Sequence, residues 1–286
     1  MEHAVPREAI KDLIRKSWQN ARRWAAPERL RRYRSLLFQL YVLAALLAFS
    51  ILALAASVTE YLEFDLEATR ELQSEIPPGF GLMMQAISWP GYTIQAVIIV
   101  ALVVILLSAM GLRWEALTAL FAAGSSTAIN YMIKIVIRRP RPTGDLVDVF
   151  QTLDSYSFPS GHVMFYTAFF GFLLFLAFIL PRRSLQRTLT MVFLALMISL
   201  VGFSRMYLGE HWASDVIGGY LLGSLALLLT IEFYRWGKTR YFTGQPLIPD
   251  TGYYEEEDPY FDPKAIARGV APDERDSTRP RPKQRT

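Results

Sequence analysis

Cysteine is absent from the 286-residue sequence, which excludes disulfide bonds and thiol catalysis. Histidine is scarce, with three copies, so the place of each one along the chain is informative. Charge is missing from several long stretches, Leu36–Val58 and Val163–Leu180 among them. Because 52% of the residues are hydrophobic and the mean hydropathy is +0.22, the chain is too apolar for an ordinary soluble domain of this length.

Six apolar stretches are predicted to cross a membrane as helices, since about 20 helical residues span a hydrocarbon core of about 30 Å. They are Leu36–Val58, Tyr92–Leu112, Glu115–Ile137, Val163–Leu180, Thr188–Ser204 and Trp212–Tyr234. The first stretch is too long and begins too far along the chain for a cleaved signal peptide, so we expect it to be retained. The predicted fold is all-α, a polytopic membrane protein with six transmembrane helices.

The six-helix domain is expected to cover residues 36–236, with a segment of different composition on each side. Residues 1–35 are basic, and their apolar positions from Ile10 to Ala21 recur at helical spacing, which favours a helix on the cytoplasmic membrane surface. A short partner-binding helix is the alternative. Residues 237–286 mix acidic, basic and proline-rich runs and are expected to form a flexible cytoplasmic tail. The pI near 9.2 comes largely from charges beside the membrane, so nucleic acid is not an indicated partner, and the oligomeric state is left open.

Lysine and arginine in the short flanks predict the orientation, because positive residues are retained on the cytoplasmic side. The arginine-rich segment before the first span places that end inside. The even-numbered spans then end inside too, near Arg113, Arg182, Arg183, Arg187, Arg235, Lys238 and Arg240. We therefore expect a protein of the cytoplasmic membrane with both termini in the cytoplasm.

One basic group falls on the predicted outer side, where retention in the cytoplasm cannot explain it. It consists of Lys134, Arg138, Arg139 and Arg141. Long basic side chains near helix ends can snorkel to lipid headgroups, which is one explanation. The six-span scheme offers another, because it brings other polar residues to the same membrane face. These are Ser160 and His162 at the start of the fourth span, Arg205 at the end of the fifth, and His211 and Asp215 at the start of the sixth. A pocket at the outer membrane face is the prediction.

The residue types in this predicted pocket suit an anion. His162 lies where a hydrophobic helix begins, and the free backbone N–H groups of such a helix end can face an anion. Ser160 is a good N-cap, and Gly161 allows close backbone approach. A proline turn with an ordinary helix cap is the alternative for this tetrapeptide. His211 and Asp215 are four residues apart, so they share a helix face, and the carboxylate can fix the imidazole tautomer. The alternative is an ordinary helix start, at which the helix dipole favours an acidic residue.

Metal binding is not indicated by this set of residues. Magnesium or a two-metal centre needs several carboxylates, yet the motifs supply one acid, Asp215, among the three cations Lys134, Arg141 and Arg205. Zinc would need a third ligand or an HExxH spacing, and neither is present near the two histidines. We therefore expect protein cations in place of a metal, and no cofactor.

Three motifs occur in order: K-x6-RP from Lys134 to Pro142, PSGH from Pro159 to His162, and SR-x5-H-x3-D from Ser204 to Asp215. This pattern resembles the type 2 phosphatidic acid phosphatase superfamily, over roughly residues 64–234. The resemblance implies that the phosphate is held by Lys134, Arg141, Arg205, Ser160 and the Gly161 amide. It also implies that His211 is the nucleophile, Asp215 its orienting partner, and His162 the acid that protonates the leaving oxygen.

The function that the resemblance implies is a metal-independent membrane phosphatase acting through a phosphohistidine. Within the family's range, an isoprenoid diphosphate is the first expectation for the substrate, with phosphatidic acid or phosphatidylglycerol phosphate close behind. Two alternatives stay open. One is transfer of the phosphate to a sugar or lipid acceptor, and the other is a non-catalytic transporter or scaffold that binds lipid phosphates.

Overall fold

The computed structural model describes residues 28–75, 77–179 and 184–241. The described residues from Leu37 to Tyr241 belong to one compact unit. The helices discussed below belong to this unit, to which α2 contributes from Leu37 onward. The predicted surface helix around residues 10–21 and the predicted tail beyond Tyr241 lie outside the described residues.

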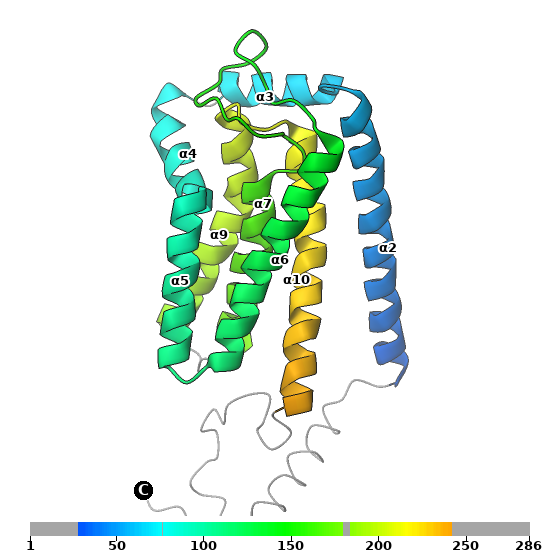
Figure 1. Ribbon diagram of the computed structural model, residues 1–286, viewed down its shortest axis with the longest axis vertical. Coiled ribbons are helices and arrows are strands. Elements are labelled where there is room, and N and C mark those ends of the chain that lie inside the picture. Colours follow the sequence, from blue (N-terminus) through cyan, green and yellow to red (C-terminus); the bar gives the residue numbers. More distant parts are fainter. Residues whose placement is uncertain (1–27, 76, 180–183, 242–286) are drawn as a thin grey trace, which may run out of the picture. The chain divides into compact units, whose positions relative to one another are not determined.

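All regular secondary structure in the described ranges is helical (Figure 1). The long helices are α2 (Glu28–Val58), α5 (Thr93–Ala109), α6 (Arg113–Ile137), α9 (Leu185–Tyr207) and α10 (Ala213–Tyr241). The shorter ones are α3 (Glu63–Glu75), α4 (Gly81–Ser88), α7 (Gly161–Phe165) and α8 (Gly171–Ile179). Two 3₁₀ turns, η1 (Pro78–Phe80) and η2 (Trp89–Gly91), flank α4, and a π-helical turn, η3 (Tyr166–Phe170), joins α7 to α8.

Five helical segments of the described chain are long and apolar enough to cross a membrane, and a bent pair makes six. The five are Leu36–Val58, Arg113–Ile137, Gly161–Ile179, Leu185–Tyr207 and Ala213–Tyr241. This confirms the prediction of an all-α polytopic membrane protein.

The second predicted span differs from the expected single helix over Tyr92–Leu112. It consists of Gly81–Gly91 and Thr93–Ala109, bent by 58° relative to each other. Pro90 lies in η2 at this bend, and a proline both lacks the N–H that an α-helix needs and clashes with the preceding turn. The bend carries α4 away from the axis of α5, toward the end of the bundle that bears α3 (Figure 1).

The continuous helix from α7 to α8 is the most buried of the spans. Its side chains Met164, Phe169 and Phe172 are fully buried. Helix α10 approaches it closely at Gly223, where an added Cβ would lie 2.8 Å from the Cβ of Thr167. A larger residue could not pack there without displacing one helix. Nearer the start of α10, an added Cβ at Gly219 would lie 3.0 Å from the carbonyl oxygen of Ser160, so the start of α7 packs beside this part of α10.

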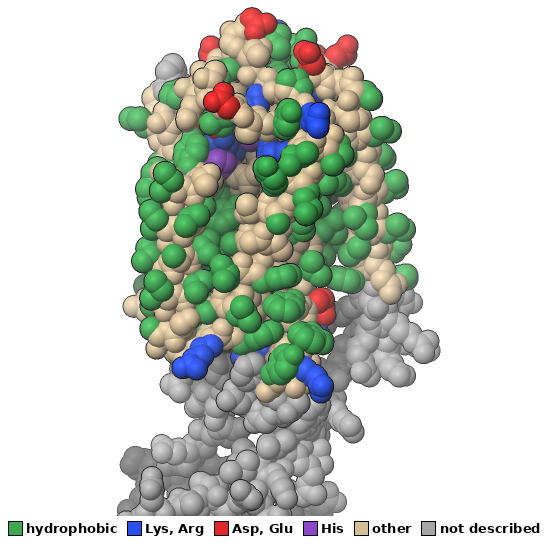
Figure 2. Space-filling view, viewed as in Figure 1, with side chains coloured by type: hydrophobic (Ala, Val, Ile, Leu, Met, Phe, Trp, Pro, Cys, Tyr) green, Lys and Arg blue, Asp and Glu red, His purple; other side chains and the backbone are tan. Residues whose placement is uncertain are grey.

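The polar helix ends gather at one end of the bundle. Helices α6 and α9 end there, α7 and α10 begin there, and α3 and the 138–160 loop lie across the same end (Figure 1). On the face shown in Figure 2, most of the visible acidic side chains lie at this end, whereas basic side chains are visible at both ends. A histidine and neighbouring basic side chains are visible in a hollow just below the α3 end. The chain therefore brings its polar motifs together from four separate helices.

Candidate active site

The structure brings the predicted site residues together at this end of the bundle. Nη1 of Arg141, from the 138–160 loop, lies 3.2 Å from Nε2 of His211. Nδ1 of His211 lies 3.4 Å from Oδ2 of Asp215, at the start of α10. The N–H of Ser160 donates to the backbone carbonyl of Asp215 at 3.0 Å. Lys134, Arg141, Arg205 and His211 are all close enough to His162 to interact with it electrostatically.

His211 and Asp215 form a buried pair with a defined orientation. Since the guanidinium of Arg141 can only donate, Nε2 of His211 accepts from it. The tautomer assigned from these partners therefore carries its proton on Nδ1, toward Asp215, and a lone pair on Nε2. Asp215 is itself fixed, because its Oδ2 also accepts from the Trp212 N–H at 2.9 Å and from the hydroxyl of Ser157.

The charge states of His211 and Arg141 follow from their surroundings. Burial, and then the positive charge of Arg141, lower the pKa of His211 well below the ordinary value of 6.5. Burial lowers the pKa of Arg141 to about 10, while the carboxylate of Asp215 opposes that shift. At neutral pH, His211 is therefore a neutral imidazole beside a charged guanidinium.

Two of the predicted phosphate-binding cations are held by backbone carbonyls. Nζ of Lys134 donates to the carbonyl of Ser157 at 2.9 Å. Arg141 donates from Nε to the carbonyl of Ser155 at 2.7 Å and from Nη1 to that of Glu210 at 2.5 Å. These contacts fix the 138–160 loop over the helix ends and hold both cations beside His211.

Three polar atoms at the site are buried and have no hydrogen-bond partner in the part of the chain that the structure describes. They are Oγ of Ser160, Nε of Arg205 and Nε2 of His162. An unsatisfied buried polar group costs about 1–3 kcal/mol, so three together indicate a binding site. A phosphoryl group, rich in acceptor oxygens, would satisfy the two donors. Gly161 lies beside them, and a Cβ there would lie 3.1 Å from Oδ1 of Asn130, so a larger residue would require the Asn130 side chain to shift.

Glu210 is a site residue that the sequence analysis missed. It is buried, its Oε2 forms an ion pair with Nη2 of Arg205, and its Oε1 accepts from the hydroxyl of Tyr92 at 3.1 Å. Arg205 also donates from Nη1 to the hydroxyl of Ser88 at 3.1 Å. The available signal was the position of Glu210 directly before His211 in the third motif.

Arg139 is the second site residue that the sequence analysis missed. It was named as one of four basic residues near a helix end, for which snorkelling to lipid headgroups was one explanation. Its guanidinium is fully buried and donates to Oδ1 of Asp215 at 2.7 Å and to Oδ2 of Asp65 at 2.8 Å. Asp65, on α3, also accepts from the Ser214 N–H at 2.7 Å. Arg139 thus holds Asp215 and ties α3 to the start of α10. Arg138 beside it is exposed, as a snorkelling residue would be.

The expectation of one acid among three cations is therefore wrong for the site as a whole. Glu210 and Asp65 add two buried carboxylates, and Arg139 adds a fourth cation. The added carboxylates are each paired with an arginine rather than with one another. Among the described residues, no group of three or more His, Asp and Glu side chains is arranged to hold a metal ion.

The helices form an integral-membrane bundle, and the buried cations and unsatisfied donors at one end suit an anionic group. Comparison with known proteins gives the family. Residues 115–238 match the PAP2 superfamily. This matched region contains all three motifs, so it is similar to the superfamily of type 2 phosphatidic acid phosphatases that the motifs predicted.

Two curated relatives and one solved structure show how far the similarity extends. The chain is 35% identical over 121 residues to phosphatidylglycerophosphatase B of Bacillus subtilis, covering 42% of this chain and 58% of that protein. It is 30% identical over 113 residues to an undecaprenyl-diphosphatase of Sulfolobus acidocaldarius, covering 38% of this chain and 43% of that protein. The matched region thus spans about half the length of these relatives.

The solved structure covers more of the fold. It is the crystal structure of a transmembrane PAP2-type phosphatidylglycerolphosphate phosphatase from Bacillus subtilis, with a TM-score of 0.57 and 25% identity. The similarity covers 68% of this chain and 96% of that one. This chain is therefore a multi-pass membrane protein with the fold of that transmembrane branch.

Proposed function

We propose that this chain is a membrane phosphatase that removes the terminal phosphate from a lipid phosphate or isoprenoid diphosphate, without a metal, through a phosphohistidine at His211. The observation that carries the proposal is the orientation of His211. Its Nδ1 faces Asp215 at 3.4 Å, and its Nε2 lone pair faces Arg141 at 3.2 Å, beside the other cations. The names of the two relatives, a phosphatidylglycerophosphatase and an undecaprenyl-diphosphatase, support the substrate class.

The reaction proceeds in two steps at phosphorus. In the first, Nε2 of His211 attacks, the N–P bond forms, and the bond from phosphorus to the leaving oxygen breaks. His162 gives the leaving oxygen its proton. In the second, His162 takes a proton from water as the water attacks phosphorus, and His211 is released with inorganic phosphate. Asp215 keeps the proton on Nδ1 and stabilises the charge that the ring gains.

The three cations perform the electrostatic work that a metal does in other phosphatases. Lys134, Arg141 and Arg205 neutralise the charge on the phosphoryl oxygens as they pass through the transition state. A guanidinium fork can donate two parallel bonds to a transferring phosphoryl group, and Nε of Arg205 has no partner among the described residues, so Arg205 can bind in this way. Ser160 and the Gly161 N–H complete the cradle at the start of α7.

The site is proposed to lie on the extracytoplasmic face. Basic residues at the opposite end of the described bundle support this orientation, because such residues are retained in the cytoplasm. They are Arg113, Arg187, Arg235, Lys238 and Arg240. A pocket at the ends of transmembrane helices lies at headgroup depth, so a lipid can present its phosphate without leaving the bilayer.

The test is phosphate release by the purified full-length protein in detergent with excess EDTA, against a panel of lipid monophosphates and diphosphates. We expect release from at least one member by the wild type and from none by His211→Ala. Added sugar or lipid acceptors, followed by product analysis, distinguish hydrolysis from transfer. Binding without turnover on the whole panel, or activity that EDTA abolishes and magnesium or zinc restores, would contradict the proposal.

A further inference from the structure

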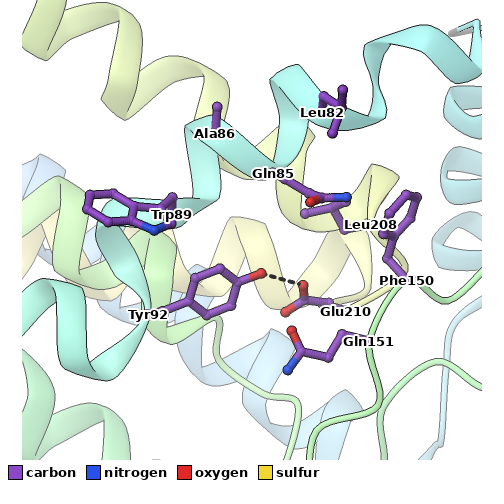
Figure 3. A pocket seen from close by; sticks show the side chains of 9 residues that line it. All are labelled: Leu82, Gln85, Ala86, Trp89, Tyr92, Phe150, Gln151, Leu208 and Glu210. Atoms are coloured by element: carbon purple, nitrogen blue, oxygen red, sulfur yellow. Dashed lines mark hydrogen bonds between the residues drawn. The ribbon is translucent and has the colours of Figure 1, made fainter.

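A pocket of about 580 Å³ lies directly beside the proposed phosphate site (Figure 3). Its walls come from α4 and η2, from the 138–160 loop and from the turn between α9 and α10. The lining residues are Leu82, Gln85, Ala86, Trp89, Tyr92, Phe150, Gln151, Leu208 and Glu210. None of the residues assigned to phosphate chemistry above is among them, so the pocket is available to another part of the substrate.

Tyr92 and Glu210 form the wall that the pocket shares with the phosphate site. The ring of Tyr92 meets the ring of His162 edge-on, with centroids 4.9 Å apart. Its hydroxyl donates to Glu210, as Figure 3 shows, and Glu210 in turn pairs with Arg205. If His162 protonates the leaving oxygen, as the proposed function holds, the group attached to that oxygen enters this pocket.

The chemistry of the lining suits a neutral group. Five of the side chains are apolar, and two amides, Gln85 and Gln151, can both donate and accept hydrogen bonds. Glu210 contributes a carboxylate at the end nearest the phosphate site, with the Gln151 amide beside it (Figure 3). The nine lining residues include no lysine and no arginine. The nearest cation, Arg205, already shares its charge with Glu210.

We infer that this pocket binds a neutral, hydroxyl- or ester-bearing group such as glycerol next to the scissile phosphate, and that Glu210 selects phosphate monoesters over diphosphates. In a diphosphate substrate, the terminal phosphate occupies the phosphate site and the second phosphate is bonded directly to it. The second phosphate therefore enters this pocket, on the side where Glu210 lies. Like charges repel in a buried site, and because Arg205 is already paired with Glu210, the lining offers no further cation to hold the second phosphate.

The experiment compares farnesyl phosphate with farnesyl diphosphate, which share one alcohol, in the same detergent micelles. The quantity measured is kcat/KM for the diphosphate divided by kcat/KM for the monophosphate. The intrinsic difference between the two leaving groups cancels when each variant is compared with the wild type. We expect Glu210→Gln to raise this ratio at least about tenfold. Glu67→Gln, the same change at an exposed position on α3, should leave the ratio at the wild-type value.

Glu210→Gln leaves Arg205 without its carboxylate partner, so this variant can fail to fold. A second variant then tests the inference. Gln151→Lys places a cation in the pocket from an exposed loop position and should raise the same ratio several-fold. An unchanged or lower ratio in the folded variants would overturn the inference while leaving the proposed function intact. A wild-type protein that released no phosphate from any lipid of the panel described above would instead overturn the proposed function and the inference with it.

Discussion

Replacing Arg139 with glutamine should lower stability and activity together, because one buried guanidinium compensates two buried carboxylates. Arg139 lies 2.7 Å from Asp215 and 2.8 Å from Asp65, and all three side chains have a relative exposure of 0%. It also donates from Nε to the carbonyl of Glu60 at 3.0 Å. Glutamine has no charge and a single amide group, so it cannot reach both carboxylates.

The magnitude follows from this geometry. Removing one partner of a buried ion pair costs about 3–5 kcal/mol. A hydrogen bond retained by glutamine recovers about 1 kcal/mol, which leaves a net loss of about 2–4 kcal/mol. At about 2–4 °C per kcal/mol for a chain of this size, the Tm should fall by about 4–16 °C. Loosening Asp215 also misplaces His211, and we expect kcat to fall about 10- to 100-fold.

The assay is thermal unfolding of the purified variants in one detergent at one heating rate. Arg138→Gln is the matched control, since it makes the same change at the neighbouring exposed residue and should leave Tm nearly unchanged. Adding Asp65→Asn to Arg139→Gln should recover part of the lost stability, because it removes one uncompensated charge. A wild-type Tm for Arg139→Gln, or a double variant less stable than the single one, would refute the reasoning.

Three further predictions concern the site and its orientation. Arg205→Lys should lose about 100-fold or more in kcat/KM, because an ammonium cannot reproduce the guanidinium fork; wild-type kinetics would remove Arg205 from the site. Turnover of nitrophenyl phosphate should persist below pH 6.5, since burial and then Arg141 lower the pKa of His211 and keep Nε2 unprotonated; a loss centred at 6.5 would contradict this. Single cysteines at Thr143 and Ser184 test orientation with an impermeant thiol reagent on intact cells. Labelling at position 143 alone is expected, and labelling at 184 alone would reverse the topology.

The fold could be predicted from the sequence largely because membrane spans obey a simple length rule. The uncharged run Leu36–Val58 has the length of a membrane-spanning helix. The bend before α5 could not be predicted. Pro90 was visible, but whether a proline ends a span or bends it depends on the packing of α4 against neighbouring helices.

The set of site residues could be proposed from the sequence because each motif has fixed internal spacing. The residues that pair with them could not be proposed in this way. Arg139 is a surface cation when considered alone, and only its contact with Asp65, 74 residues away in sequence, shows that it is buried in an ion pair. Glu210 likewise has no signature apart from its neighbour His211. Contacts between distant helices decide such roles, and a single sequence does not encode them in any local pattern.

The most direct test of the central claim is a rapid-quench experiment with radiolabelled nitrophenyl phosphate and excess chelator. A good leaving group departs without help, so His162→Ala should still form the phosphoenzyme. The water that attacks next then lacks its base, and acid-labile label should accumulate on the protein. His211→Ala should carry no label and release no phosphate. Label trapped on protein that lacks His211, or phosphate release by that variant at the wild-type rate, would contradict a phosphohistidine mechanism.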